Sequence, residues 1–190
     1  MTAGHLAVLI GAGVPLTVML VTAGLCFKAQ GKTPRGLTVV KILGLVSVAA
    51  VGWALWVAAP PSGAETGLSV ALFGVALILY AWALWTHRGR WPTRVYCDDV
   101  PAHLVVTGPY RLVRHPCYGA YVLLYTGALV AGRSPWLVVV LLANAALYWH
   151  AARREERKFA SSALAADYEA YRRRTGMLLP NPVKMLRRKS

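Results

Sequence analysis

Long apolar runs separated by polar segments dominate the first half of the chain. Residues 3–27 contain no Lys, Arg, Asp or Glu, and residues 37–59 and 68–86 form two further apolar runs. About 20 apolar residues, at 1.5 Å each, span the ~30 Å hydrocarbon core of a bilayer. Each run therefore predicts a transmembrane helix, and the polar segments 28–35 and 59–67 predict loops between them.

Two shorter apolar runs follow a long polar segment. Residues 87–116 contain four prolines and show no helical period, which favours a functional loop. Residues 117–131 and 135–150 are apolar and are joined by a short turn whose Ser-Pro pair is typical of a helix start. Either arm alone is short for a span, so we expect a helical hairpin whose second helix continues past His150 through RREERKF. A re-entrant pair is the alternative.

The distribution of positive charge predicts an orientation. Of the 21 Lys and Arg residues, all except Arg133 lie in residues 28–41, in residues 88–114, or from residue 153 onward. Positively charged loops face the cytoplasm. The sequence thus predicts an all-α polytopic integral membrane protein with five transmembrane helices, the last two as a hairpin, an outside N-terminus and a cytoplasmic C-terminus. We expect a bacterial-type inner (plasma) membrane.

Composition narrows the class further. Hydrophobic residues make up 57% of the 190-residue chain, while the formal net charge is +14. Such a charge can indicate nucleic-acid binding, but its placement beside apolar runs fits cytoplasmic loops, so no nucleic-acid partner is expected. The three cysteines Cys26, Cys97 and Cys117 have no CxxC spacing and support neither a disulfide framework nor a metal site. The N-terminal run has no charged leader and predicts a retained helix.

A cationic segment, GPYRLVRHPCYG at residues 108–119, leads directly into the fourth apolar run. Pro116 is suited to the first position of a helix, where unpaired backbone N–H groups can bind an anion. His115, Arg111 and Arg114 lie beside this expected helix start. The segment is therefore a candidate site, with a basic loop that touches lipid headgroups as the alternative.

A tandem pair of acidic residues, Glu155 and Glu156, lies at the predicted inner end of the fifth helix. The chain has only seven acidic residues, and adjacent side chains on a helix point about 100° apart. Because the hairpin returns toward the base of the fourth helix, we expect these carboxylates to face His115 across a small pocket. The alternative is a solvated helix end neutralised by its neighbouring arginines.

A third cluster follows in the tail. Tyr168 and Tyr171 are spaced by about one helical turn, and three arginines come directly after them. This pattern predicts an amphipathic interfacial helix with an aromatic face, which is compatible with a lid over the site.

These motifs together resemble the isoprenylcysteine carboxyl methyltransferase and phospholipid methyltransferase superfamily of integral membrane enzymes. The resemblance covers about residues 100–182. It rests on TGPYRxVRHPxY, then on the tandem Glu after a hairpin, and then on Tyr-x-x-Tyr-x-x-Arg and Pro180. The tail departs from the family pattern, with SSALAAD in place of a Phe-Gly and Thr-Gly-Met in place of Val-Pro-Arg.

The resemblance implies methyl transfer from S-adenosyl-L-methionine, bound between the RHP segment and the tandem Glu under the tail. The residues it implies for the cofactor are Leu104, Val105, Gly108, Tyr110, Arg114, His115, Pro116, Tyr118, Glu155 and Glu156. The catalytic candidates are Arg111 and Arg174, to orient the acceptor, and Glu156, which like His115 could take a proton from an amine acceptor. A carboxylate acceptor would need no base, and no metal is implied.

The resemblance also implies a lipophilic acceptor that enters from the bilayer and meets the cofactor at the cytoplasmic face. An isoprenoid or prenylcysteine-like carboxylate or thiol and a lipid amine remain open. The chain would then comprise a three-helix transmembrane region, residues 1–86, and a catalytic region, residues 87–190. Two other functions remain open: a nicotinamide-dependent membrane reductase of the sterol-reductase type, and a non-enzymatic transport component. The latter predicts charges within the spans, where only Lys41 occurs.

Overall fold

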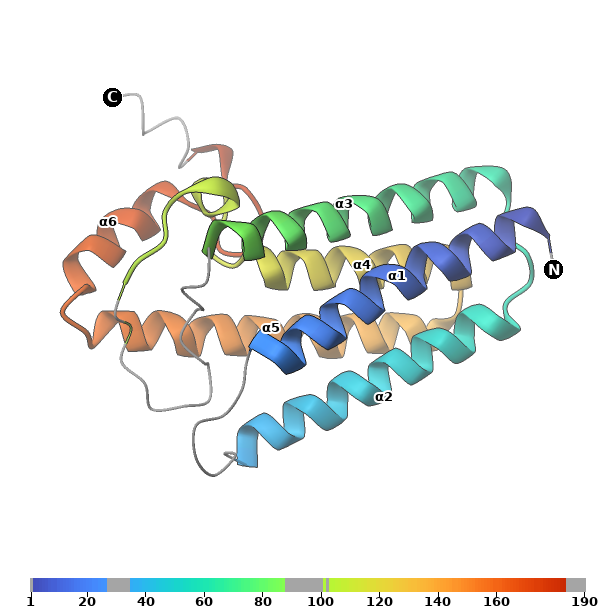
Figure 1. Ribbon diagram of the computed structural model, residues 1–190, viewed down its shortest axis with the longest axis horizontal. Helices are drawn as coiled ribbons and strands as arrows, with labels where there is room; N and C mark the ends of the chain where they lie inside the picture. The colour runs from blue at the N-terminus through green and yellow to red at the C-terminus, as the bar shows by residue number, and fades with distance from the viewer. Residues whose placement is uncertain (1, 27–34, 88–100, 102, 184–190) are drawn as a thin grey trace. The chain divides into compact units, whose positions relative to one another are not determined.

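The computed structural model describes residues 2–26, 35–87, 101 and 103–183, and all regular structure within them is helical (Figure 1). Cys97 and most of the predicted loop 87–116 lie outside the described residues, as does the side chain of Cys26. The described elements are α1 (Ala3–Cys26), α2 (Arg35–Val57), α3 (Gly63–His87), the 3₁₀ helix η1 (Gly108–Arg111), α4 (Pro116–Gly132), α5 (Pro135–Ala160) and α6 (Ala165–Arg174).

The helix boundaries follow the apolar runs closely, with one correction in α3. Helices α1 and α2 match their predicted ranges to within two residues. Residues 63–67, predicted as part of a loop, instead form the first turn of α3. The Ser62 N–H donates to Glu65 Oε2 at 2.7 Å, and the Glu65 N–H donates to Ser62 Oγ at 3.3 Å. This reciprocal capping box stabilises a polar first turn, which a search for apolar runs overlooks.

The two predicted helix starts at proline are confirmed. Helix α4 begins at Pro116 and α5 at Pro135, and α5 continues without a break to Ala160. The fixed φ of proline and its missing N–H suit the first turn of a helix. The tandem Glu therefore lies on the same continuous helix as the apolar run before it.

Among the described residues, four helices are long and apolar enough to cross a membrane: α1, α2, α3 and α5. Helix α4, the fourth predicted span, has 17 residues and covers only about 26 Å. The chain is an integral membrane protein, while the count of five spans and the orientation remain predictions.

The chain forms two compact units. Unit 1 comprises residues 1–78 and 120–146, and unit 2 comprises residues 79–119 and 147–190. Helices α3, α4 and α5 contribute residues to both. This division does not test the predicted functional regions 1–86 and 87–190, which remain a prediction.

Small residues allow the helices of unit 1 to approach closely. Gly11 of α1 faces Phe73 of α3, and a Cβ there would lie 3.2 Å from the ring. A Cβ on Gly127 of α4 would lie 2.8 Å from the other edge of the same ring. Small residues at helix contacts are typical of membrane bundles, where packing replaces the hydrophobic effect between helices.

Buried polar side chains link further helices within unit 1. Asn144 of α5 donates from Nδ2 to Ser47 Oγ of α2 at 2.9 Å, and His5 Nε2 of α1 lies 2.9 Å from the Leu55 carbonyl oxygen of α2. Hydrogen bonds of this kind hold membrane helices in register.

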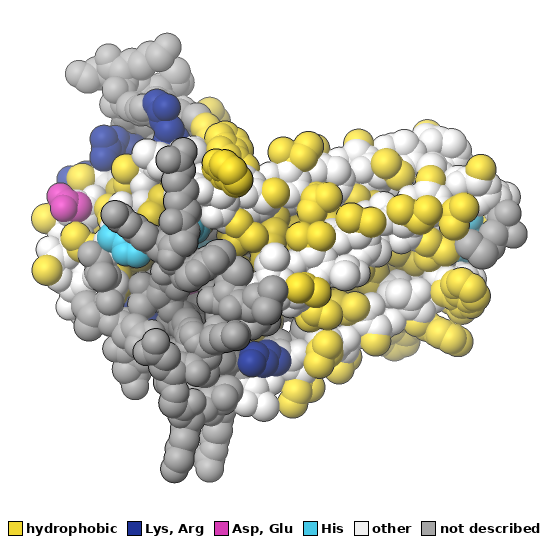
Figure 2. All heavy atoms as spheres, in the orientation of Figure 1, with side chains coloured by type: hydrophobic (Ala, Val, Ile, Leu, Met, Phe, Trp, Pro, Cys, Tyr) yellow, Lys and Arg dark blue, Asp and Glu magenta, His cyan; other side chains and the backbone are white. Residues whose placement is uncertain are grey.

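The outer surface of unit 1 is apolar. Hydrophobic side chains cover much of the visible helical surface in Figure 2, and Trp53 and Leu142 are 69% and 63% exposed. Soluble monomers rarely expose apolar surface on this scale. A lipid environment explains it.

Candidate active site

Every predicted site residue lies in unit 2. This unit contains the end of α3, the segment 103–115 with η1, the first turn of α4, the end of α5, and α6 with the segment that follows it.

Gly108 sets the path of the chain into η1. Its φ is 56°, a left-handed conformation, and a Cβ at this position would overlap the hydroxyl of Thr86 in α3. Glycine alone meets both demands without strain. The predicted turn at Gly108 and Pro109 is thereby confirmed.

Tyr110 connects η1 to α3 and to α6. Its hydroxyl lies 2.7 Å from His87 Nε2 at the end of α3, and its carbonyl oxygen accepts a 2.7 Å hydrogen bond from the Tyr171 hydroxyl of α6. Burial, and to a smaller extent the nearby Cys117 and Glu155, raise the pKa of Tyr110 well above its ordinary value. Tyr110 is therefore a neutral structural link.

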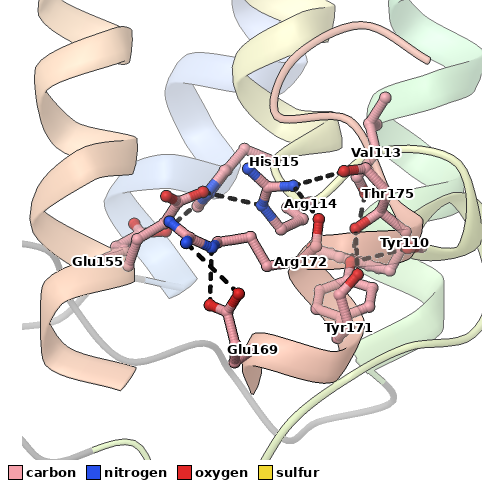
Figure 3. A network of polar contacts seen from close by, with 10 residues as sticks. Tyr110, Val113, Arg114, His115, Glu155, Glu169, Tyr171, Arg172 and Thr175 are labelled. Carbon is pink, nitrogen blue, oxygen red and sulfur yellow. Dashed lines mark hydrogen bonds and ion pairs between the residues drawn. The ribbon is translucent and has the colours of Figure 1, made fainter. Parts of the chain in front are cut away.

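Arg114 and Glu156 form a buried ion pair, and Figure 3 shows Arg114 within the network of polar contacts around it. Arg114 Nε lies 2.8 Å from Glu156 Oε1, with the two side chains 6% and 7% exposed. Arg114 Nη1 also donates to the carbonyl oxygens of Thr175 at 2.5 Å and Arg172 at 3.3 Å. Loss of one partner of such a pair leaves a buried charge, at a cost of about 3–5 kcal/mol. This pair ties the RHP segment to α5 and to the tail.

His115 lies between the two carboxylates. Its Nδ1 is 3.1 Å from Glu155 Oε2, and its Nε2 is 3.6 Å from Glu156 Oε1, too far for a hydrogen bond. The buried Nε2 has no hydrogen-bond partner among the described residues. Burial lowers the pKa of His115, but the two carboxylates raise it by more, so the pKa lies above its ordinary value of 6.5.

Glu155 has a different set of partners. The Tyr118 hydroxyl donates to Glu155 Oε1 at 2.7 Å. The Tyr118 ring stacks between those of His115 and Tyr148, with centroid distances of 5.7 and 5.5 Å. The Glu155 side chain remains 24% exposed. The two adjacent carboxylates thus diverge, as expected for a helix, but they contact His115 and Arg114 directly and not across a pocket.

The segment after α6 pairs with the RHP segment. The Arg114 N–H donates to the Gly176 carbonyl at 2.9 Å, and the His115 N–H donates to the Met177 carbonyl at 3.0 Å. The backbone N–H groups of Arg114 and His115 are therefore both occupied by the segment after α6. A Cβ on Gly119 would lie 3.1 Å from the Leu178 carbonyl oxygen, which shows how closely this segment covers the start of α4.

Helix α6 confirms the predicted tail helix but not its bilayer-facing aromatic side. Tyr168 and Tyr171 are both buried, and Phe159 of α5 stacks on Tyr168 at a centroid distance of 4.5 Å. The aromatic face packs within unit 2, and the following arginines are exposed. Tyr at one-turn spacing suits a protein core as well as a membrane surface, and the interfacial position of α6 stays a prediction.

An open groove of about 1280 Å³ lies between the end of α5, α6 and residues 176–182. Its charged and aromatic lining residues are Arg114, Trp149, Arg153, Glu156, Glu169, Arg172, Arg173 and Arg174. Arg174 and Glu156 line the same groove, and the acceptor-orienting role of Arg174 stays a prediction.

Three other predicted residues make no described contact with the tandem Glu. Arg111 is exposed, and no ion pair between described residues includes it. Leu104 and Val105 lie half-buried in the segment before η1, and none of the described contacts joins them to the carboxylates.

Sequence reasoning missed His87, Tyr148, Trp149 and Arg153. His87 directly follows the apolar run 68–86, and a histidine at this position was a usable signal. Trp149, Arg153 and Glu156 are spaced i, i+4 and i+7, which places them on one face of α5.

Comparison with known proteins agrees with the resemblance read from the sequence. The sequence model of the phospholipid methyltransferase family matches residues 64–166, more than half of the chain. The match includes the RHP segment and the tandem Glu but ends before Tyr168, Tyr171 and Arg174. A search of curated proteins found no match. The chain belongs to the phospholipid methyltransferase family and is a membrane methyltransferase of that superfamily.

Proposed function

We propose that the protein transfers a methyl group from S-adenosylmethionine to a lipophilic acceptor at the cytoplasmic face of the membrane. One observation carries the proposal. Within the matched region, the tandem Glu contacts the RHP segment directly, and the Glu155 side chain stays 24% exposed.

The residues around Glu155 suit the cofactor. S-adenosylmethionine has a sulfonium, an ammonium, a carboxylate and two ribose hydroxyls. Glu155 can accept hydrogen bonds from the ammonium or the hydroxyls, and the stacked rings of Tyr118 and Tyr148 favour a nearby cation. The unpartnered Nε2 of His115 is a buried polar atom that a bound group would satisfy.

The chain itself contributes mainly positioning. When bound, the cofactor supplies an activated methyl group on its sulfonium. The Arg114–Glu156 pair holds α5 and the tail in place around that site. Near-attack placement of two reactants can contribute about 7–11 kcal/mol. Of the acceptor-orienting candidates, Arg174 lines the groove and is favoured over Arg111.

The identity of the acceptor atom affects the role of Glu156. A carboxylate or thiolate acceptor needs no base, whereas an amine must lose a proton. Because Glu156 already pairs with Arg114, we propose that it positions the site and is less suited to accept a proton than His115 or Glu155.

Binding of S-adenosylhomocysteine, measured by calorimetry on the full chain in detergent, tests this function. We expect micromolar binding by the parent protein. We expect Glu155→Gln to weaken it by tenfold or more, as for the loss of a charge-assisted hydrogen bond of about 1.5–3 kcal/mol. Asp167→Asn makes the same chemical change at an exposed site in the first turn of α6 and should bind as the parent does.

Glu156→Gln is a poor probe, because it leaves the buried Arg114 without its counter-charge. A folded parent protein that binds no S-adenosylhomocysteine would contradict the proposal. Binding of a nicotinamide nucleotide instead would support the reductase.

A further inference from the structure

A tryptophan and an arginine form an ordered pair on the exposed face of α5. The guanidinium carbon of Arg153 lies 5.4 Å from the centroid of the Trp149 ring. Both side chains are exposed, and both line the groove that Glu156 also lines. A cation–π contact of this kind holds a long, flexible side chain in one place.

The cation of Arg153 has no carboxylate partner among the described residues, unlike most of its neighbours in the groove. Arg114 pairs with Glu156 at 2.8 Å, and Arg172 pairs with Glu169 at 2.8 Å. Arg153 makes no such pair. Five arginines and two glutamates line the groove in all. Its excess positive charge favours an anionic ligand.

The groove borders the proposed cofactor position, because Arg114 and Glu156 line it. S-adenosylmethionine carries two positive groups and one carboxylate, so the arginine-rich remainder of the groove suits it poorly. Glu155, the residue proposed to bind its cationic groups, does not line the groove. An anionic second substrate fits the groove better.

The position of the pair along α5 suggests an amphiphile. The helix is apolar from Pro135 to Trp149, and its charged residues begin at Arg153. Trp and Arg are typical of the boundary between hydrocarbon and water. Arg153 also precedes Glu156 by three residues, about 4.5 Å along the axis. An anion held by Arg153 therefore lies beside the tandem Glu.

We propose that Trp149 and Arg153 form a subsite that binds the anionic group, a phosphate or carboxylate, of a lipophilic methyl acceptor. That the bound ligand is the methyl acceptor rests on the proposed function. That the subsite binds an anionic amphiphile does not depend on that function. Arg153 selects anionic over zwitterionic headgroups, and Trp149 holds its guanidinium in place and contacts the adjoining apolar tail.

The test is calorimetry on the full chain in an uncharged maltoside detergent with four probes. These are dihexanoyl phosphatidic acid, laurate, dihexanoyl phosphatidylcholine and inorganic phosphate. We expect the two anionic amphiphiles to bind at least tenfold more tightly than the other two. Arg153→Gln should weaken their binding about tenfold or more and leave S-adenosylhomocysteine binding unchanged. Arg157→Gln, which removes the same charge from an exposed position on α5 outside the groove lining, should bind like the parent.

Several results would overturn the proposal. One is a zwitterionic lipid or inorganic phosphate that binds as tightly as the anionic amphiphiles do. Another is an Arg153→Gln variant that binds the anionic amphiphiles as tightly as the parent does. Loss of S-adenosylhomocysteine binding in that variant would place Arg153 in the cofactor site instead. If the parent binds anionic amphiphiles through Arg153 but binds no S-adenosylhomocysteine, the methyltransferase function fails and the subsite stands.

Discussion

At the scale of single residues, His115 shows how the site combines burial with charge. Its imidazole is buried, which alone would favour the neutral ring. Glu155 and Glu156 face it from α5, and the guanidinium of Arg114 lies close by on Glu156. The carboxylates outweigh the effect of burial, so the pKa of His115 is raised above 6.5.

A raised pKa predicts that His115 contributes less to stability as the pH rises. Below pH 6.5 the imidazolium is present in both folded and unfolded chains, and its attraction to the carboxylates stabilises the fold fully. As the pH rises through the folded-state pKa, the proton and this contribution are lost. The melting temperature of the parent should therefore exceed that of His115→Asn most at pH 6, with the difference shrinking toward pH 9.

His150→Asn provides the control, because His150 is exposed on α5. The melting temperature of His150→Asn should differ little from that of the parent between pH 6 and pH 9. If the melting temperature of the parent exceeds that of His115→Asn by more as the pH rises, the buried ring is neutral in the folded protein.

At the scale of elements, the turn after α6 depends on Gly176. A Cβ there would overlap the carbonyl oxygen of Leu179 and lie 3.2 Å from the backbone nitrogen of Asn181. These are backbone atoms, which cannot rotate away as a side chain can. The Gly176 carbonyl also accepts the hydrogen bond from the Arg114 N–H.

Gly176→Ala should therefore open this turn and detach the segment after α6 from the RHP segment. We expect S-adenosylhomocysteine binding to fall at least tenfold and the melting temperature to drop by several degrees, as for a loss of about 1–3 kcal/mol. Gly52→Ala places a methyl group in open space on α2 and should change neither. Unaltered binding in Gly176→Ala would mean that the segment does not shape the cofactor site.

The sequence predicted the helices better than the contacts between them. Apolar runs end where a bilayer-length helix ends, so the boundaries of α1 and α2 could be read from local pattern, and Pro135 marked the start of α5. The capping box of Ser62 and Glu65 was also local, but it is polar and so was taken for a loop.

Contacts between distant residues could not be read in the same way. The pairing of Arg114 with Glu156 joins residues 42 positions apart, and either could have paired with a neighbour on its own segment. The motif order placed both near the site. Only the packing of the folded chain determines that Arg114 pairs with Glu156, while Arg153 has no carboxylate partner among the described residues.

At the scale of the whole molecule, α4 decides whether the chain crosses the membrane four or five times. Its 17 residues cover about 26 Å of a ~30 Å core. A short span is accommodated by local thinning of the bilayer, at a modest cost per ångström of mismatch. Five crossings would also place the three segments rich in Lys and Arg on one side and leave Arg133 alone on the other, as the positive-inside rule favours.

Arg133 itself supports a fixed turn between α4 and α5. Its Nη1 lies 3.0 Å from Glu65 Oε2, and its Nη2 donates to the Ala59 carbonyl at 2.9 Å, both within unit 1. These contacts join the turn to the loop that precedes α3. If that loop is outside, as the charge distribution predicts, the turn is outside with it.

Labelling of single cysteines distinguishes a crossing α4 from a re-entrant one. In a chain whose native cysteines are replaced by serine, Ser134→Cys reports on the α4–α5 turn and Ser161→Cys on the end of α5. An impermeant maleimide added to intact cells should label the first and not the second, whereas inside-out vesicles should show the reverse. Detergent-solubilised protein should label at both positions, which confirms that each thiol is reachable. Labelling of both from the same side would mean that neither α4 nor α5 crosses, and exchange of the two patterns would mean that α5 crosses without α4. In either case the count of five spans would be wrong.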